Sequence, residues 1–415
     1  MMDLDRWTEI AASLRNNRLR TVLTAAGVFW GMFMLVVMLG FGDGLERGVK
    51  RNMSGFATNA VYIWGGRTSI PHAGMRPGRW ISYDNSDVEA LSQLASIEHL
   101  APRNRLGGWR GGSLVVRGAE AESYAVMGDV PAFRHIAPVI FEQGRFLNDL
   151  DMAEHRKVAV IGRRVYEELF PTGEDPIGDH IRINGVWFQV VGVFRSTRAD
   201  DRGDRDNGTI HIPFTTFQRA FNVGDRVGWI AMTAHPESRA SDLEAEVKQI
   251  LSERKGIHPD DQAIGSYNAE EEFRKLTTLF TGIRFFVWFV GTMTLAAGVV
   301  GVSNIMLIVV QERRKEIGLR RAIGATPASV VAMVVQESVV LTAVAGYAGL
   351  VAAVLVIEAA GPFVGGPGST MDPPQLDVGA ALVAAGVLLV AGGLAGVFPA
   401  RNAALVAPVE ALQAE

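Results

Sequence analysis

The chain contains no cysteine among its 415 residues, so neither a disulfide bond nor thiolate chemistry is available to it. A strong net charge is missing as well, because 40 basic and 44 acidic residues leave a balance of −4. A protein that binds nucleic acid through its charge needs a basic excess. We therefore expect no nucleic-acid partner.

Signatures of catalysis and of metal or nucleotide binding are also absent from the sequence. The eight histidines show no H-E-x-x-H spacing, and neither a G-x-S-x-G elbow nor a G-x-x-x-x-G-K-[ST] phosphate loop occurs. The sequence therefore predicts no catalytic, cofactor-binding or metal-binding residue in this chain.

Long apolar runs are present instead. Residues 21–42, 285–310, 331–357 and 378–399 each reach the roughly 20 residues that a helix needs to cross a bilayer. The first run is too long for a signal peptide, and no small-x-small cleavage site follows it, so we expect an uncleaved anchor. The sequence predicts a membrane protein with four transmembrane helices.

The basic residues near these runs predict the topology, because Lys and Arg stay on the cytoplasmic side. They lie before the first run and between the second and third, whereas residues 358–377, between the third and fourth, contain none. Both termini, including the tail 400–415, are therefore expected in the cytoplasm of a bacterial cell. Residues 43–282 then form a large domain outside the inner membrane.

Residues 1–20 carry apolar side chains at helical spacing, at Leu4, Trp7, Ile10 and Leu14. This pattern predicts an amphipathic helix that lies in the cytoplasmic membrane interface. A helix that packs on protein would show the same pattern.

The outer domain alternates short strand-like runs with helical ones, which predicts an α+β fold. We expect a helix over residues 85–94, another over 240–255, and a β-hairpin that turns at Asn184-Gly185. Residues 198–208, rich in Asp and Arg, are predicted to form a solvated mobile loop.

A long helix is predicted from Asn268 onward. Asn268 can cap it, Glu271 can complete a capping box, and no proline occurs before Gln311. Such a helix would be roughly 60 Å long, twice the hydrocarbon thickness. Residues 268–284 would then form a stalk that continues the second span.

Residues 311–326 are charged although they lie between two apolar runs. Glu316 and Arg320 have the i, i+4 spacing of a helical ion pair, and Gly324 followed by Thr326 and Pro327 indicates a helix end and a new start. The apolar stripe of this short helix is Leu319, Ala322 and Ile323. Retention of a basic loop inside the cell needs neither the acids nor this stop, so the pattern favours docking on a cytoplasmic partner.

Three stretches resemble one family. They are ERRKEIGLRRAIGAT with the following VVQESVVLTAVAGYAGLVAA, the run from GRFLNDLDMAEHRKVAVIG to INGVWFQVVGVF, and the ending FPARNAALVAPVEAL. Together they are similar to the MacB/FtsX-like permeases, the transmembrane subunits of type VII ABC transporters. The resemblance covers nearly the whole chain in the expected order.

The resemblance implies a fold and partners. The outer domain would be a MacB-like periplasmic core domain with two lobes, one formed by residues 43–115 and 226–275 and one inserted at 116–225. A second copy of this chain or a related permease would pair with it, and two copies of a separate ATPase would bind ATP and Mg²⁺. A periplasmic adaptor and an outer-membrane channel stay open as further partners, and membrane lipids surround the spans.

The resemblance also implies a role for the loop 311–326 as the coupling helix that fits a groove on the ATPase. Carried over position by position, this role falls on Glu312, Arg313, Glu316, Gly318, Arg320, Arg321 and Gly324.

Small and charged residues inside the spans are further candidates. Gly27 and Gly31 form a G-x-x-x-G motif in the first run that would suit a dimer interface, and Gly392 and Gly396 form another in the fourth. Glu337 lies inside the third run, where we expect a structural pairing rather than a proton relay.

The sequence thus predicts a non-catalytic permease that transmits ATP-driven motion to its outer domain and exports or extracts a substrate such as a drug, peptide, lipid or lipoprotein. An FtsX-type regulator of a cell-wall hydrolase is the alternative, disfavoured by the size of the outer domain. A membrane-embedded enzyme is disfavoured by the missing catalytic residues. The sequence does not separate the substrates, nor a homodimer from a heterodimer.

Overall fold

The structure is a computed structural model that describes residues 18–53, 57–107, 111–171, 173–198, 200–364 and 371–405. The chain divides into two compact units, Met1–Gly48 with Leu279–Glu415, and Val49–Thr278. The helix predicted over residues 1–20 lies almost entirely outside the described residues.

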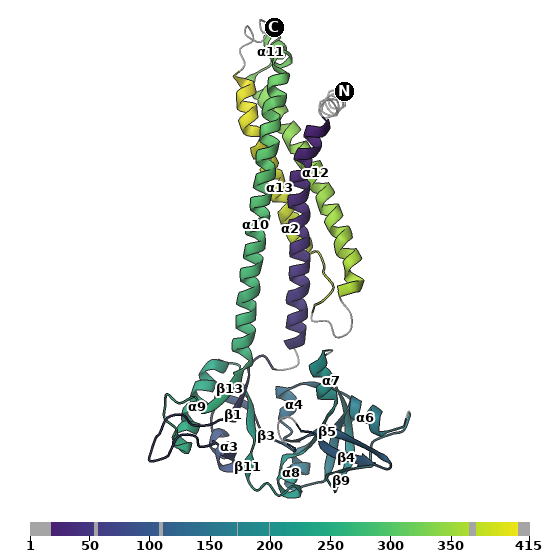
Figure 1. Ribbon diagram of the computed structural model, residues 1–415, viewed down its shortest axis with the longest axis vertical. Coiled ribbons are helices and arrows are strands. Elements are labelled where there is room, and N and C mark those ends of the chain that lie inside the picture. Colours follow the sequence, from purple (N-terminus) through teal and green to yellow (C-terminus); the bar gives the residue numbers. More distant parts are fainter. Residues whose placement is uncertain are drawn as a thin grey trace. The chain divides into compact units, whose positions relative to one another are not determined.

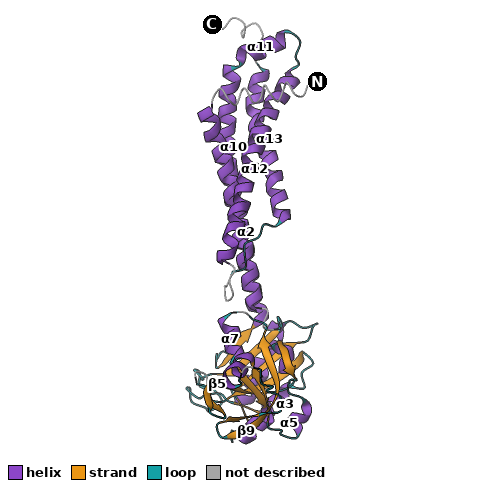
Figure 2. Ribbon diagram, turned by 90° about the vertical axis from the view of Figure 1, so that its right-hand side faces the viewer, coloured by secondary structure: helices purple, strands orange, loops and turns teal. Residues whose placement is uncertain are grey.

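The first unit is a helical bundle. Four long helices run side by side in it (Figures 1 and 2), and each contains a segment long and apolar enough to cross a membrane. They are α2 (Arg18–Met53), α10 (Ala269–Glu312), α12 (Pro327–Val364) and α13 (Val378–Ala404), with the short α11 (Arg314–Ala322) between α10 and α12. The prediction of four membrane-spanning helices is confirmed.

Small residues let the helices of this bundle approach closely. A Cβ atom added at Gly346 would lie 2.1 Å from the Leu388 side chain, and one at Gly396 would lie 2.7 Å from Ser338 Oγ. Close backbone approach is how helices associate in a membrane, where no hydrophobic effect drives them together. The motif that contains Gly396 therefore packs α13 against α12.

Replacing Gly349 by Ala is expected to destabilise the bundle by about 1–3 kcal/mol, the usual cost of overpacking. A Cβ there would lie 2.5 Å from the Phe29 backbone oxygen of α2, which cannot move aside like a side-chain tip. Thermal unfolding of the purified chain in detergent measures the effect. Gly386→Ala is the matched control, because no atom lies within 4 Å of its added Cβ. Equal melting temperatures for the two variants would contradict this α2–α12 contact.

The second unit holds all thirteen strands of the described residues, with short helices around them. The strands are β1 (Ala60–Gly65), β2 (Tyr83–Asp84), β3 (Ile97–Arg105), β4 (Ser113–Arg117), β5 (Glu120–Asp129), β6 (Val139–Gly144), β7 (Val158–Gly162), β8 (His180–Ile183), β9 (Val186–Ser196), β10 (Thr209–Pro213), β11 (Arg226–Val227), β12 (Trp229–Ala234) and β13 (Ile264–Asn268). The helices are α3 (Asn85–Leu91), α4 (Phe133–Ile136), α5 (Asp149–Ala153), α6 (Arg163–Leu169), α7 (Asp201–Asn207), α8 (Phe214–Ala220) and α9 (Ala240–Lys255).

Two groups of strands make up the main sheet. Strands β3, β12, β1 and β13 pair antiparallel in that order, while β5, β4, β8, β9, β7 and β10 close into a ring through the parallel pairing of β10 with β5, and β6 pairs with β9 of this ring. Each group has its own apolar core, the first around Ile63 and Leu243, the second around Phe188 and Ile210. This arrangement confirms the predicted α+β class.

A buried charge cluster lies where the two strand groups meet. Asp129, at the end of β5 and fully buried, accepts two hydrogen bonds from Arg103 of β3 and contacts His211 Nδ1 of β10. The Arg103 guanidinium stacks 3.6 Å from the Phe133 ring centroid and 5.3 Å from that of Trp229. A single carboxylate thereby joins three strands.

Several local predictions are confirmed. The hairpin turns at Asn184 and Gly185, both with positive φ, and Ile183 pairs with Val186 across it. The helix predicted over 240–255 is α9, and α10 runs unbroken from Ala269 to Glu312.

Three local predictions were wrong in part. The helix predicted over 85–94 ends at Leu91. The segment predicted as a mobile loop contains helix α7, capped by Asp200, whose Oδ1 accepts from the Gly203 amide at 3.0 Å. Asn268 does cap α10, but Glu271 pairs with Lys275 instead of closing a capping box.

Candidate functional site

Helix α11 is a short helix that follows α10. The two are separated by a break at Arg313, whose ψ of 15° departs from helical geometry. The loop predicted as residues 311–326 therefore consists of the last residues of α10, the helix α11 and a link to α12. Glu312 is the last residue of α10. Gly324 follows α11 with φ +106°, a conformation that glycine adopts without the strain of a Cβ.

Three charged side chains of the loop form one cluster. Arg313 donates to both carboxylate oxygens of Glu316 at 2.9 Å, and Arg320 Nη2 lies 2.8 Å from Glu316 Oε1. The hydrogen bonds from Arg313 lower the pKa of Glu316. Glu316 thus holds the start and the end of α11 in one arrangement, and the predicted Glu316–Arg320 pair is confirmed.

Two arginines fasten this loop to the other helices. Arg313 Nη1 lies 3.5 Å from Glu337 Oε2, a carboxylate of α12 that is 5% exposed. Arg321 Nη1 donates to the Ala404 carbonyl at 2.8 Å, at the C-terminus of α13 where cations are favoured. The expectation of a structural pairing for Glu337 is confirmed. These contacts link the α11 loop to α12 and α13 as well as to α10.

The two faces of α11 differ in burial. Ile317 and Gly318 are buried, whereas Leu319 is 54% and Ile323 is 79% exposed. Leu319 and Ile323 are four residues apart and so lie on the same face of the helix. The sequence predicted that these residues belong to an apolar stripe. Only the structure shows that the stripe is exposed and does not pack into the bundle.

A cleft of about 270 Å³ lies between α11 and the first turns of α12. Arg313, Arg320 and Glu337 contribute to its wall, and Arg320 Nη1 contacts the Met333 sulfur at 2.8 Å. The cleft belongs to the same charged site.

The predicted dimer-interface glycines face another helix of the same chain. A Cβ added at Gly27 would lie 3.7 Å from the Gly298 Cα atom of α10, and one at Gly31 would lie 3.2 Å from Leu295. This contact accounts for the G-x-x-x-G motif without a second copy. The role of Gly27 and Gly31 in a dimer stays a prediction.

No group of three or more metal-ligating side chains occurs among the described residues.

Comparison with known proteins assigns the chain to a family. Residues 21–250 match the MacB-like periplasmic core domain, and residues 288–406 match the FtsX-like permease C-terminal domain. The chain belongs to the MacB/FtsX-like ABC transporter permeases. Permeases of this family work with ABC ATPase partners, and the α11 loop lies within the FtsX-like part.

Curated relatives of this MacB/FtsX-like permease include exporters. The pyoverdine export ATP-binding/permease protein PvdT of Pseudomonas entomophila is 32% identical over 407 residues, which cover 96% of this chain and 58% of the relative. The macrolide export ATP-binding/permease protein MacB of Rhodospirillum rubrum is 31% identical over 410 residues, covering 97% and 59%. The chain thus spans a little over half the length of these relatives.

A solved structure also resembles the permease in part. The periplasmic region of MacB from Actinobacillus actinomycetemcomitans aligns with 55% of this chain and 96% of its own length, at 20% identity and a TM-score of 0.44.

Proposed function

We propose that this permease transmits ATP-driven motion from the cytoplasmic side of the inner membrane to its extracytoplasmic domain, and thereby exports or extracts a substrate. Two copies of a separate ATPase would bind ATP and Mg²⁺ and dock on α11, and a second permease would complete the dimer. The observation that carries the proposal is the exposed apolar face of α11 on a loop fastened to three helices.

The charge distribution supports the orientation that this proposal needs. The basic side chains of the α11 loop favour the cytoplasm, and both termini would then lie there with residues 43–282 outside. The match of residues 21–250 to a periplasmic core domain agrees with this direction.

The continuity of α10 supports a mechanical role. Its 44 residues correspond to about 65 Å of helix, more than twice the roughly 30 Å hydrocarbon thickness. The helix begins directly after β13 of the outer domain and ends one residue before the Arg313 break. Displacement of α11 therefore reaches the outer domain through a single covalent element.

The substrate is expected to be a drug, peptide, lipid or lipoprotein. The names of the PvdT and MacB relatives, a pyoverdine exporter and a macrolide exporter, support export of a moderately sized molecule. A periplasmic adaptor and an outer-membrane channel would complete an export path across a second membrane.

Charge reversal of Arg320 tests the coupling role. We expect Arg320→Glu to lower ATP hydrolysis by the complex of this permease with its ATPase about tenfold, because it places a carboxylate beside Glu316 and opens the Arg313–Glu316–Arg320 cluster. Lys315→Glu is the matched control, since it changes the loop charge equally at an exposed residue outside the cluster.

Full ATP hydrolysis by the Arg320→Glu complex would show that α11 is not the coupling element. An equal loss of ATP hydrolysis in both variants would mean that the ATPase responds only to the net charge of the loop.

A further inference from the structure

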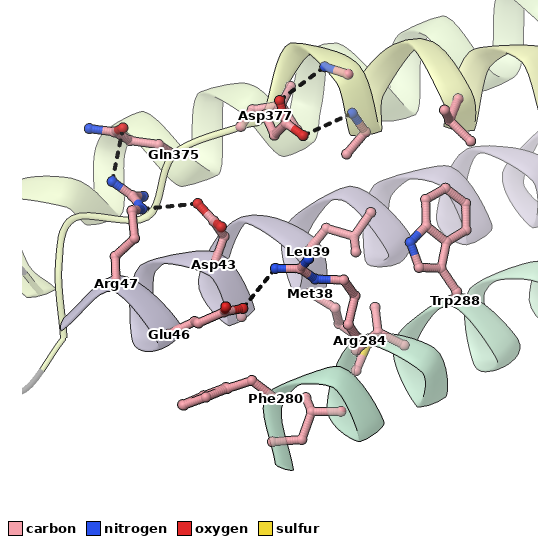
Figure 3. A pocket seen from close by; sticks show the side chains of 17 residues that line it. Met38, Leu39, Asp43, Glu46, Arg47, Phe280, Arg284, Trp288, Gln375 and Asp377 are labelled. Carbon is pink, nitrogen blue, oxygen red and sulfur yellow. Dashed lines mark hydrogen bonds and ion pairs between the residues drawn. The ribbon is translucent and has the colours of Figure 1, made fainter. Parts of the chain in front are cut away.

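A second site lies at the opposite end of the bundle from α11. A cavity of about 660 Å³ opens between the end of the apolar segment of α2, residues 280–288 of α10 and the first turns of α13 (Figure 3). All of its lining residues belong to the helical unit. At this end α2 and α10 adjoin residues 49–278 in the sequence, so it is the extracytoplasmic end in the orientation proposed above.

The deeper wall of this cavity is apolar. Met38 and Leu39 of α2, Val287 and Trp288 of α10, and Val383 of α13 contribute to it. On α2 and α10 these positions lie near the point where the helix becomes polar, and on α13 Val383 lies near the start of the helix. Trp is enriched at the level of lipid headgroups. The wall therefore lies at the depth of the upper acyl chain.

The rim of the cavity is charged with both signs. Arg284 Nη2 lies 2.7 Å from Glu46 Oε2, and Arg47 Nε lies 3.0 Å from Asp43 Oδ2. Asp377 completes the rim while its carboxylate caps α13. Figure 3 shows Arg47, Asp43 and Glu46 toward the left of the opening and Trp288 toward the right, with Arg284 between them beside Met38 and Leu39.

We propose that this cavity holds one zwitterionic phospholipid, with one of its two acyl chains against Trp288 and Val383 and its headgroup on the charged rim. An apolar space at membrane depth is filled by hydrocarbon rather than water, since water there lacks polar partners. Arg284 is suited to the phosphate: its side chain is 56% exposed and Glu46 is its one partner among the described residues.

The charges of the rim favour a zwitterionic lipid headgroup over an anionic one. Three carboxylates face two guanidinium groups, so an ammonium group finds an acceptor while a headgroup with net negative charge meets a net negative rim. A phosphoethanolamine headgroup, with one phosphate and one ammonium, matches this pattern. The inference does not depend on the coupling role of α11, and only the choice of leaflet rests on the proposed orientation.

Gly42 provides a direct test, because it lines the cavity and no atom lies within 4 Å of a Cβ added there. The Cβ of a leucine at this position meets no neighbouring atom, so the added side chain can occupy part of the cavity. Gly386→Leu on α13 is the matched control, since it also meets no atom within 4 Å but does not line the cavity.

The experiment uses the full chain in nanodiscs with equal parts of phosphatidylethanolamine and phosphatidylglycerol. After transfer to detergent, native mass spectrometry counts the phospholipids retained by each chain. We expect one retained phosphatidylethanolamine in the wild type and in Gly386→Leu, about tenfold lower occupancy in Gly42→Leu, and a similar loss in Arg284→Gln. Equal retention in Gly42→Leu and the wild type, or preferential retention of phosphatidylglycerol, would overturn the proposal.

A second readout uses the tryptophan in the cavity wall. Phosphatidylethanolamine with acyl chains brominated near the headgroup quenches tryptophan fluorescence on contact. The part of the quenching that disappears in Trp288→Phe is expected to fall in Gly42→Leu and to persist in Gly386→Leu. If that part were the same in all three backgrounds, lipid would contact Trp288 only from the outside of the bundle, and the proposal would be wrong.

Discussion

Replacing Leu319 with Asp is expected to weaken binding of the ATPase on the order of 100-fold. Burial of a leucine side chain contributes about 2 kcal/mol, and desolvation of an unpaired carboxylate adds a further penalty, while each 1.4 kcal/mol corresponds to a factor of ten. Leu319 is 54% exposed on α11, so the substitution leaves the packing of the bundle intact. Ile323→Asp, 79% exposed on the same face, is expected to act similarly.

Surface plasmon resonance with the purified ATPase measures this effect. Leu114→Asp is the matched control, because Leu114 is 55% exposed but lies on β4 of the outer domain. A dissociation constant for Leu319→Asp within threefold of the wild type would show that the exposed face of α11 is not the docking surface. An equal loss in Leu114→Asp would point to general damage instead.

Replacing Asp129 with Ala is expected to lower the free energy of unfolding of the outer domain by about 3–5 kcal/mol, the usual cost of removing one partner of a buried ion pair. Asp129 is fully buried, and without it Arg103 keeps its charge in an apolar setting between Phe133 and Trp229. Urea unfolding followed by tryptophan fluorescence measures the change, since Trp229 lies beside Arg103.

Asp260→Asn is the control for this substitution, because the Asp260 side chain is 85% exposed. It should shift the unfolding midpoint by no more than a surface change does, within about 0.5 kcal/mol. Equal stability of the Asp129→Ala variant and the wild type would mean that the cluster does not join the two strand groups.

The same cluster predicts a pH dependence. Burial opposes the ionised form of Asp129, but Arg103 and His211 outweigh it and lower its pKa from 3.8 to about 2. Because the folded pKa lies below the unfolded value, the stabilisation is complete above about pH 5 and is lost as the pH falls through about 2. This part of the acid sensitivity should vanish in Asp129→Asn.

Local sequence rules predicted the elements whose causes are local. A run of about 20 apolar residues spans a bilayer because the hydrocarbon thickness sets the helix length, so the four spans followed from residue counts. Asn184-Gly185 folds as a hairpin turn because both residues accept positive φ. Thr326 and Pro327 start α12 where they were expected, and Ser329 N donates to Thr326 Oγ1.

Contacts between distant segments decided the rest. The Asn268 amide donates to Glu244, 24 residues away, and Arg321 reaches the end of α13 at Ala404. Neither partner has a fixed spacing that a motif could encode. The sequence around Asp206 predicted a solvated loop, but Asp206 lies in helix α7 and accepts a hydrogen bond from Ser196 Oγ. Burial raises the pKa of its carboxyl.

By itself, therefore, the sequence determined that this chain has four spans, an α+β outer domain and a charged break between the second and third spans. Only the tertiary structure decided which face of α11 remains exposed, which helix the glycines Gly27 and Gly31 approach, and which charges border the cavity near Arg284. The physical reason is that periodicity records which residues share a face, while the choice of partner for that face is made by helices far away in the chain.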